Sequence, residues 1–144
     1  MGKQVFRAAV GSAALGLLGM VVVGCASQMH ARPVDPSILP KLAGSYSGYY
    51  TGAGGRANPA TLTIDDKGNY TMSITQTGVS TSGTIGVDGG QLVFKRTGLT
   101  GPTQDRAFAS GTVDYQEAPD GSVILTGFGR DDVGPLSVSF TKRK

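Results

Sequence analysis

The chain has 144 residues, with 13 Lys and Arg against 10 Asp and Glu, one His, one Cys and no Trp. A single cysteine excludes a disulfide within the chain, so the fold depends on packing, which a domain of about 100 residues can supply. The formal net charge of +3 is far from the concentrated basic face that nucleic-acid binding requires. We therefore expect no nucleic-acid partner.

The first 24 residues have the pattern of a secretory signal peptide. Lys3 and Arg7 precede a run from Ala8 to Val23 that contains no ionisable residue. The run has 16 residues and is shorter than the roughly 20 that a transmembrane helix needs. A basic start, a short apolar middle and small residues at the end are typical of a segment that is removed after secretion.

The segment ends in Val22-Val23-Gly24-Cys25, which resembles the lipobox of bacterial lipoproteins. In that family a diacylglycerol is attached to the cysteine sulfur, the preceding peptide is removed, and the new amino group is acylated, for example with palmitate. The resemblance implies that residues 1–24 are cleaved and that Cys25 becomes the lipidated first residue. More than one acyl chain is needed for stable anchoring, and this modification supplies them.

The residue after the lipidated cysteine bears on the location of the protein. In the lipoprotein family of enteric bacteria, Asp at this position tends to retain the protein in the inner membrane. Here the position is Ala26. The resemblance therefore implies an outer-membrane lipoprotein with its domain in the periplasm, with the cell surface and the inner membrane as alternatives.

The segment from Ala26 to Lys41 has the composition of a tether. It contains Pro33, Pro36 and Pro40 and few apolar residues. Proline favours extended chain and resists helix formation. We therefore predict a lipidated cysteine and an extended arm over residues 25–41, followed by a folded domain over residues 42–144.

From Leu42 onward the apolar residues alternate with polar ones. Leu62 and Ile64 alternate with threonines, a turn follows at 65–69, and Tyr70, Met72 and Ile74 alternate with Thr and Ser. This period of two indicates a half-buried hairpin with one apolar face and one hydroxyl-bearing face. No helical period is apparent after residue 25.

The same signal recurs along the domain, separated by turns rich in Gly and Asp and by a longer loop over Thr97–Asp105. The predicted strands are Gly44–Gly52, Ala60–Asp65, Asn69–Gln76, Val79–Val87, Gln91–Arg96, Ala107–Gln116, Ser122–Gly129 and Leu136–Lys142. Eight short strands joined mainly by tight turns favour an all-β fold, an antiparallel up-and-down barrel that closes on itself. A two-sheet β-sandwich is the alternative.

The first predicted strand carries a second resemblance. Its residues Leu42-Ala43-Gly44-Ser45-Tyr46-Ser47-Gly48 resemble the opening strand of lipocalin-like domains, which is marked by G-x-W. Tyr46 stands where that family has Trp. The resemblance implies a small β-barrel, and the shortness of the chain implies that any cavity inside it is small.

The domain lacks the residues of common catalytic sites. His30 lies in the predicted tether, and after Cys25 there is no other His or Cys. Zinc and copper sites of ordinary type and Cys/His or Ser/His/Asp catalysis are therefore not expected. Asp65-Asp66 and Asp131-Asp132 are interpreted as turn residues that cap backbone amides. We expect no enzymatic activity, no metal and no cofactor.

The candidate ligand-facing residues are aromatic, apolar or basic side chains in phase with the buried face. They are Tyr46, Tyr50, Met72, Phe94 and Arg96. Glycines between the tyrosines leave room either for sheet curvature around a packed core or for a small, mostly apolar pocket. A tyrosine inside such a barrel needs a partner for its hydroxyl.

Together these patterns predict a non-enzymatic envelope protein held on a membrane by lipid at Cys25. Its barrel is expected to bind a small apolar ligand or a protein partner. The alternatives are a structural or assembly accessory that acts through surface contacts and an inhibitor of a hydrolase. An open cavity would favour a ligand, whereas a solid core would favour surface contacts.

Overall fold

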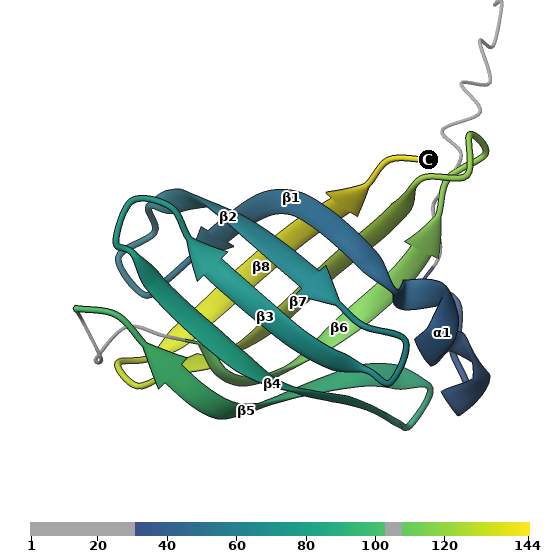
Figure 1. Ribbon diagram of the computed structural model, residues 1–144, viewed down its shortest axis with the longest axis horizontal. Helices are drawn as coiled ribbons and strands as arrows, with labels where there is room; N and C mark the ends of the chain where they lie inside the picture. Colours follow the sequence, from purple (N-terminus) through teal and green to yellow (C-terminus); the bar gives the residue numbers. More distant parts are fainter. Residues whose placement is uncertain (1–30, 103–107) are drawn as a thin grey trace, which may run out of the picture.

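Eight antiparallel strands close into a barrel in the computed structural model, which describes residues 31–102 and 108–144 (Figure 1). Each strand pairs with its neighbours in the chain, and β8 (Pro135–Lys142) pairs with β1 (Gly44–Thr51) to complete the ring. The predicted up-and-down barrel is confirmed, and the sandwich is excluded. The other strands are β2 (Ala57–Ile64), β3 (Asn69–Ile74), β4 (Val79–Asp88), β5 (Gln91–Thr100), β6 (Phe108–Glu117) and β7 (Val123–Asp131).

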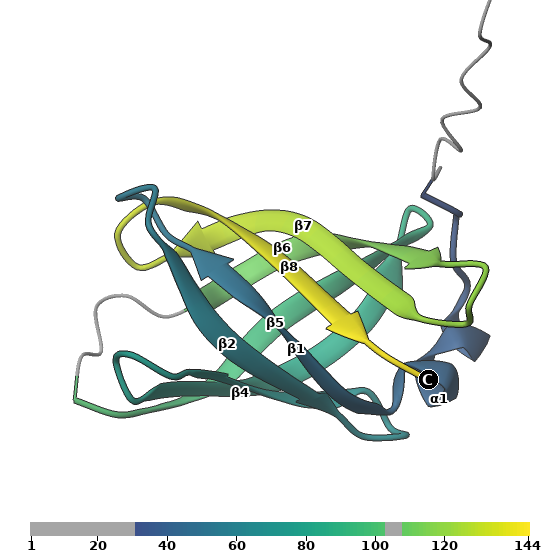
Figure 2. The ribbon, with the colours of Figure 1, turned by 90° about the horizontal axis from the view of Figure 1, so that it is seen from above.

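The turns place the strand connections at two opposite ends of the barrel (Figures 1 and 2). One end, here called the helix end, carries the turns 65–68, 89–90 and 118–122 together with the short helices that precede β1. The loop end carries the connections 52–56, 75–78 and 132–134. The tightest turn joins β4 and β5 through Gly89 and Gly90, whose φ angles are 56° and 79°. A two-residue hairpin loop of this kind needs positive φ at both positions, which glycine adopts without strain.

The segment before β1 differs from the expected extended arm. A 3₁₀ turn, η1 (Pro36–Ile38), leads into the short helix α1 (Leu39–Leu42). Asp35 caps this turn, because its carboxylate accepts a hydrogen bond from the Ser37 backbone N–H at 2.8 Å. Pro36 follows at the first helical position, where its fixed φ suits a helix and its missing N–H costs nothing. Asp35-Pro36 is therefore the start of a helix. The sequence contains this start signal, but the three prolines of the segment favoured the prediction of an extended chain.

These helices cover the helix end of the barrel. Leu42 is fully buried, and Val34, Ile38 and Leu39 pack against the core from the same segment. Lys142 of β8 fixes the end of α1, since its ammonium donates hydrogen bonds to the carbonyls of Lys41 and Ala43 at 3.0 and 2.9 Å. The folded unit thus includes part of the segment that was predicted to be a tether.

Most predicted strand ends differ from the observed ones by one or two residues, and two differ by more. β5 continues to Thr100 instead of ending at Arg96, because a bulge leaves Thr97 without a register partner and restores pairing at Gly98. β2 begins at Ala57 and so includes Pro59. Pro59 accepts a hydrogen bond from the Thr75 N–H but has no N–H to return, and β3 ends just before Thr75.

Candidate functional site in the barrel interior and at the loop end

Four of the five candidate ligand-facing residues lie inside the barrel. Tyr46, Tyr50, Met72 and Phe94 are each 4% exposed or less. They alternate along β1, β3 and β5 with outward-facing polar residues, so the predicted phase of these strands places them in the core. The fifth candidate, Arg96, is in the same phase and lies nearer the loop end of β5. Cys25 lies outside the described residues.

Aromatic rings fill the middle of the barrel. The rings of Tyr70 and Phe94 lie 5.0 Å apart, and Phe108 packs edge-on against both at 6.4 and 6.2 Å. These separations are typical of favourable aromatic pairs. The void that remains beside them measures about 10 Å³ and is lined by apolar atoms. That volume is at the lower limit for one water molecule, so the barrel interior has no room for an apolar ligand.

The buried tyrosines differ in how their hydroxyls are satisfied. Tyr46 donates to the carbonyl of Leu42 at 2.7 Å, which ties β1 to the end of α1. Tyr50 donates to the carboxylate of Asp131 at 2.7 Å. Burial raises the pKa of both hydroxyls well above the usual range of tyrosine. These two hydrogen bonds link the interior to opposite ends of the barrel.

The hydroxyl of Tyr70 has no hydrogen-bond partner among the described residues, although it is buried. Burial raises the pKa of Tyr70 to about 12, partly offset by the positive charge of Arg96. The hydroxyl of Thr81, which also faces the interior of the barrel, likewise has no hydrogen-bond partner among the described residues. Each of these groups costs free energy in an apolar interior, and the small void has no polar wall that would hold a water between them.

Asp131 organises the loop end of the barrel through hydrogen bonds to the β7–β8 turn and to β1. It is 8% exposed and lies at the end of β7. One carboxylate oxygen accepts the backbone N–H groups of Val133 and Gly134 at 2.8 and 2.7 Å, and the other accepts the Tyr50 hydroxyl. The predicted capping role of this aspartate is therefore confirmed, and the same side chain also links the turn to β1.

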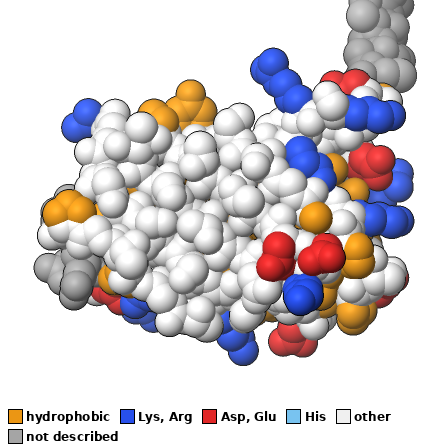
Figure 3. All heavy atoms as spheres, viewed as in Figure 1, with side chains coloured by type: hydrophobic (Ala, Val, Ile, Leu, Met, Phe, Trp, Pro, Cys, Tyr) orange, Lys and Arg blue, Asp and Glu red, His pale blue; other side chains and the backbone are white. Residues whose placement is uncertain are grey.

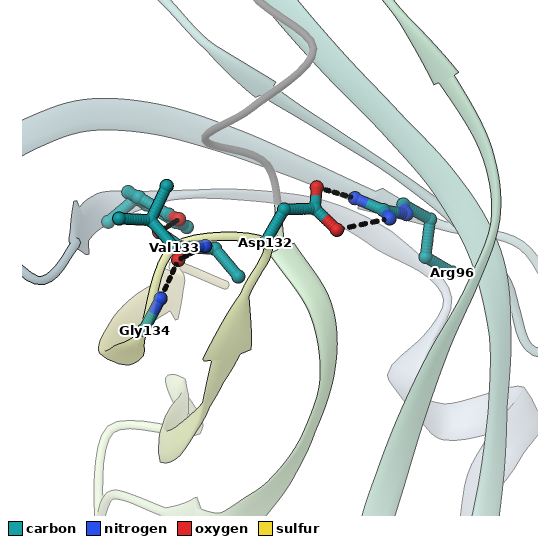
Figure 4. Close-up of polar contacts among 6 residues, drawn as sticks. Arg96, Asp132, Val133 and Gly134 are labelled. Carbon is teal, nitrogen blue, oxygen red and sulfur yellow. Dashed lines mark hydrogen bonds and ion pairs between the residues drawn. The ribbon is translucent and has the colours of Figure 1, made fainter.

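Arg96 and Asp132 form an ion pair at the same end, and Figure 4 shows the two planar groups facing one another. Two parallel hydrogen bonds of 2.8 Å join the guanidinium to the carboxylate. This contact lowers the pKa of Asp132 and raises that of Arg96. The bidentate geometry orients Arg96 from β5 toward the β7–β8 turn.

An open hollow of about 420 Å³ lies beside this polar closure. Its wall includes the candidate residue Tyr50, the core residue Ile74 and the glycine-rich 52–54 segment, together with Arg56, Asn58 and Val133. Asp131 borders the hollow, but both of its oxygens already accept hydrogen bonds from the protein.

Other site types were sought among the described residues. In residues 31–102 and 108–144, no group of three or more His, Cys, Asp or Glu is placed to hold a metal ion. Within the same ranges, no helix is long and apolar enough to cross a membrane.

Comparison with known proteins gives no relative: the chain matches no protein-family model, no curated protein and no solved structure.

Sequence reasoning missed the pairings that close the loop end. Arg96 and Asp132 are 36 positions apart, and Tyr50 and Asp131 are 81 apart. The in-phase position of Arg96 indicated that it belongs to the barrel interior, but no local pattern identified its partner. Tyr70 and Phe108, two of the three packed rings, are absent from the candidate set. The place of Phe108 at the start of a predicted strand was a usable signal.

Proposed function

We propose that this protein is a lipid-anchored bacterial envelope protein that acts without catalysis, by binding another envelope component through the outer surface of its barrel. The filled interior supports this proposal, because a void of about 10 Å³ beside the aromatic rings leaves the outer surface of the barrel and the open hollow at its loop end for contact. A ligand inside would have to separate Tyr70, Phe94 and Phe108 from one another.

The anchor is proposed from Val22-Val23-Gly24-Cys25. The first described residues, from Ala31, lead into the helices at the helix end of the barrel. Only five residues separate Cys25 from Ala31, and an extended chain spans at most about 3.6 Å per residue. A lipid on Cys25 would therefore hold the barrel close to its membrane, proposed here to be the outer membrane with the barrel in the periplasm.

Metabolic labelling tests the anchor. Cells that produce the full chain are given radioactive palmitate, and the wild-type protein is expected to incorporate it. Cys25→Ser is expected to lose the label and to accumulate as the longer precursor. Met29→Leu, a change a few residues further along, is the control and should be labelled normally. Equal labelling of Cys25→Ser and wild type would rule out the lipoprotein.

Sedimentation with isolated envelope fragments tests the use of the outer surface. The chain from residue 25 onward with Cys25→Ser is mixed with fragments, so that lipid insertion cannot contribute. Binding should be reduced by Ser139→Glu, which places a charge on the outside of β8. It should be unchanged by Met72→Leu, a buried substitution that nearly conserves volume. The reverse pattern would indicate that the interior binds the partner.

A further inference from the structure

The outside of the barrel is divided into a charged part and an uncharged part. On β8, β1, β2 and β3, and on β4 from Ser80 to Gly86, the residues that alternate with buried ones are Ser, Thr, Tyr, Asn, Pro, Ala or Gly. None of them carries a charge. Figure 3 shows this broad area without blue or red over β1–β4, while charged side chains gather around the helix end. We call this surface the hydroxyl face.

The strand register arranges the hydroxyl face in rows. Ser47 pairs with Thr141 on one side and with Thr61 on the other. The row continues through Ser73 and Ser80, so that five neighbouring strands each present a hydroxyl. Adjacent strands lie about 4.7–4.9 Å apart, which sets the spacing of the row. Only the Ser73–Ser80 pair has a hydrogen bond within this row among the described residues.

Tyr49 stands on this face as its single aromatic side chain. Its side chain is 55% exposed, and its register partners are Ser139 and Pro59. A shallow hollow of about 490 Å³ surrounds it. The hollow is lined mainly by Ser, Thr, Gly, Ala and Pro around Tyr49, and Arg143, which follows β8, is the one charged residue in its lining. An exposed ring beside a group of hydroxyls can offer both a flat apolar contact and hydrogen bonds.

The composition of the face excludes several classes of partner. Nucleic acids and anionic lipid surfaces require clusters of Lys or Arg, whereas Arg143 is the single basic residue that lines the hollow. Hard cations require carboxylate oxygens, which the lining of the hollow does not contain. The centres of protein interfaces are rich in aromatic residues, Met and Arg and poor in Ser. A neutral partner that carries many hydroxyls of its own matches the face, because both sides can donate and accept and neither loses a charge to burial.

We propose that the hydroxyl face binds an uncharged carbohydrate chain, with one sugar ring lying on Tyr49. The C–H groups on one side of a pyranose carry a slight positive charge and pack well on the negative face of an aromatic ring. Neighbouring hydroxyls of Ser47, Thr61 and Ser139 then bind the ring edges. The row spacing is close to the length of one sugar in an extended β-1,4-linked chain. This inference rests on the proposed function, since it identifies the chemistry of the component that the outer surface binds.

Titration with the β-1,4-linked tetramer of N-acetylglucosamine tests the inference. The full chain is purified from whichever fraction contains it, in a polyoxyethylene detergent that carries no sugar, and binding is followed by NMR and calorimetry. Wild type should saturate below about 10 mM. Tyr49→Ala should weaken binding about tenfold or more. Val133→Ala, which alters a similarly exposed apolar residue at the loop end, should leave binding unchanged.

The outcomes separate this inference from the proposed function. No saturation by the tetramer, or equal binding by Tyr49→Ala and wild type, would overturn the inference even if the anchor and the envelope sedimentation held. Envelope binding that survives digestion of glycans but not digestion of proteins would also overturn it in favour of a protein partner. Loss of palmitate labelling would affect only the anchor, since the tetramer is titrated with purified chain.

Discussion

The two ends of the barrel are closed by different interactions. At the helix end, Leu42, the last residue of α1, is fully buried, and Ile38 and Leu39 also pack against the core. At the loop end, the closure is polar, with Asp131 bound to Tyr50 and Asp132 paired with Arg96. Apolar burial is insensitive to pH and gives way only when the packing is lost. The polar closure depends on the charge of its carboxylates, so the two ends should respond differently to mutation, acid and salt.

The comparison also bears on function. The helix end uses chain that precedes the barrel, and that chain leads back toward Cys25. Among residues 31–102 and 108–144, the hydrogen bonds and ion pair that close the loop end join residues of the barrel strands and their turns. If Cys25 carries the proposed lipid, the helix end would lie nearer the membrane than the loop end, and the barrel wall would remain available for contact. The following predictions are ordered by the size of the effect expected.

The largest effect is expected at the helix end. Leu42→Ala should lower the free energy of unfolding by about 2–5 kcal/mol, because a fully buried leucine leaves a cavity when truncated. Leu39→Ala, a partly buried neighbour in the same helix, is the control and should cost less. Denaturant unfolding measures both. A cost for Leu42→Ala below that of Leu39→Ala would show that α1 does not seal the barrel.

An intermediate effect is expected from Asp131. Asp131→Ala removes the acceptor for two backbone N–H groups and for Tyr50, and should cost about 1–3 kcal/mol. Tyr50→Phe removes only one of these hydrogen bonds and should cost about 0.5–1.5 kcal/mol. The double variant should cost less than the sum, because the two residues share one contact. Strict additivity in unfolding measurements would argue against the Tyr50–Asp131 hydrogen bond.

The smallest effect is expected from the ion pair. Asp132 is partly exposed, so Asp132→Asn should cost only about 0–1 kcal/mol at neutral pH. Arg96 lowers the pKa of Asp132 in the folded state. The stabilisation is therefore present above the unfolded pKa of about 3.9 and is lost as the pH falls through the lower folded value.

A pH series of thermal unfolding temperatures tests this sign. The difference between wild type and Asp132→Asn should shrink below about pH 4 and in 1 M salt. Asp66→Asn, at an exposed turn of the helix end, is the matched control for replacing an aspartate away from Arg96. A difference that grows on acidification would contradict the ion pair.

Much of the fold was predictable because alternation in strands is a local signal. In β2 and β3 the inward-facing residues include Leu62, Tyr70 and Met72. A shift of either strand by one residue would turn these side chains outward and bury threonines instead. The helices before β1 were missed because prolines suggested an extended chain, although Asp35-Pro36 carries a helix-start signal. The partners of Tyr50 and Arg96 could not be predicted, since closure of the barrel brings distant residues together.

The sequence also could not predict whether the interior of the barrel is a packed core or an open pocket. Both interpretations used the same inward-facing residues, including Tyr46 and Phe94. Whether the interior is packed or open depends on how much of its volume is occupied by the aromatic rings from β3, β5 and β6. That occupied volume depends in turn on strand tilt and register. Phe108 packs against both Tyr70 and Phe94, and this packing fills the middle of the barrel.

The central claim is that side chains fill the interior of the barrel and that the protein binds its partner through the outer surface. A titration with a fluorescent fatty-acid probe tests this claim. The chain from residue 25 onward with Cys25→Ser carries no lipid of its own, and the Met72 methyl group reports on the interior by NMR. The account predicts no saturable binding of the probe and no shift of the Met72 signal. Binding of one probe per chain, with a shifted Met72 signal, would contradict it.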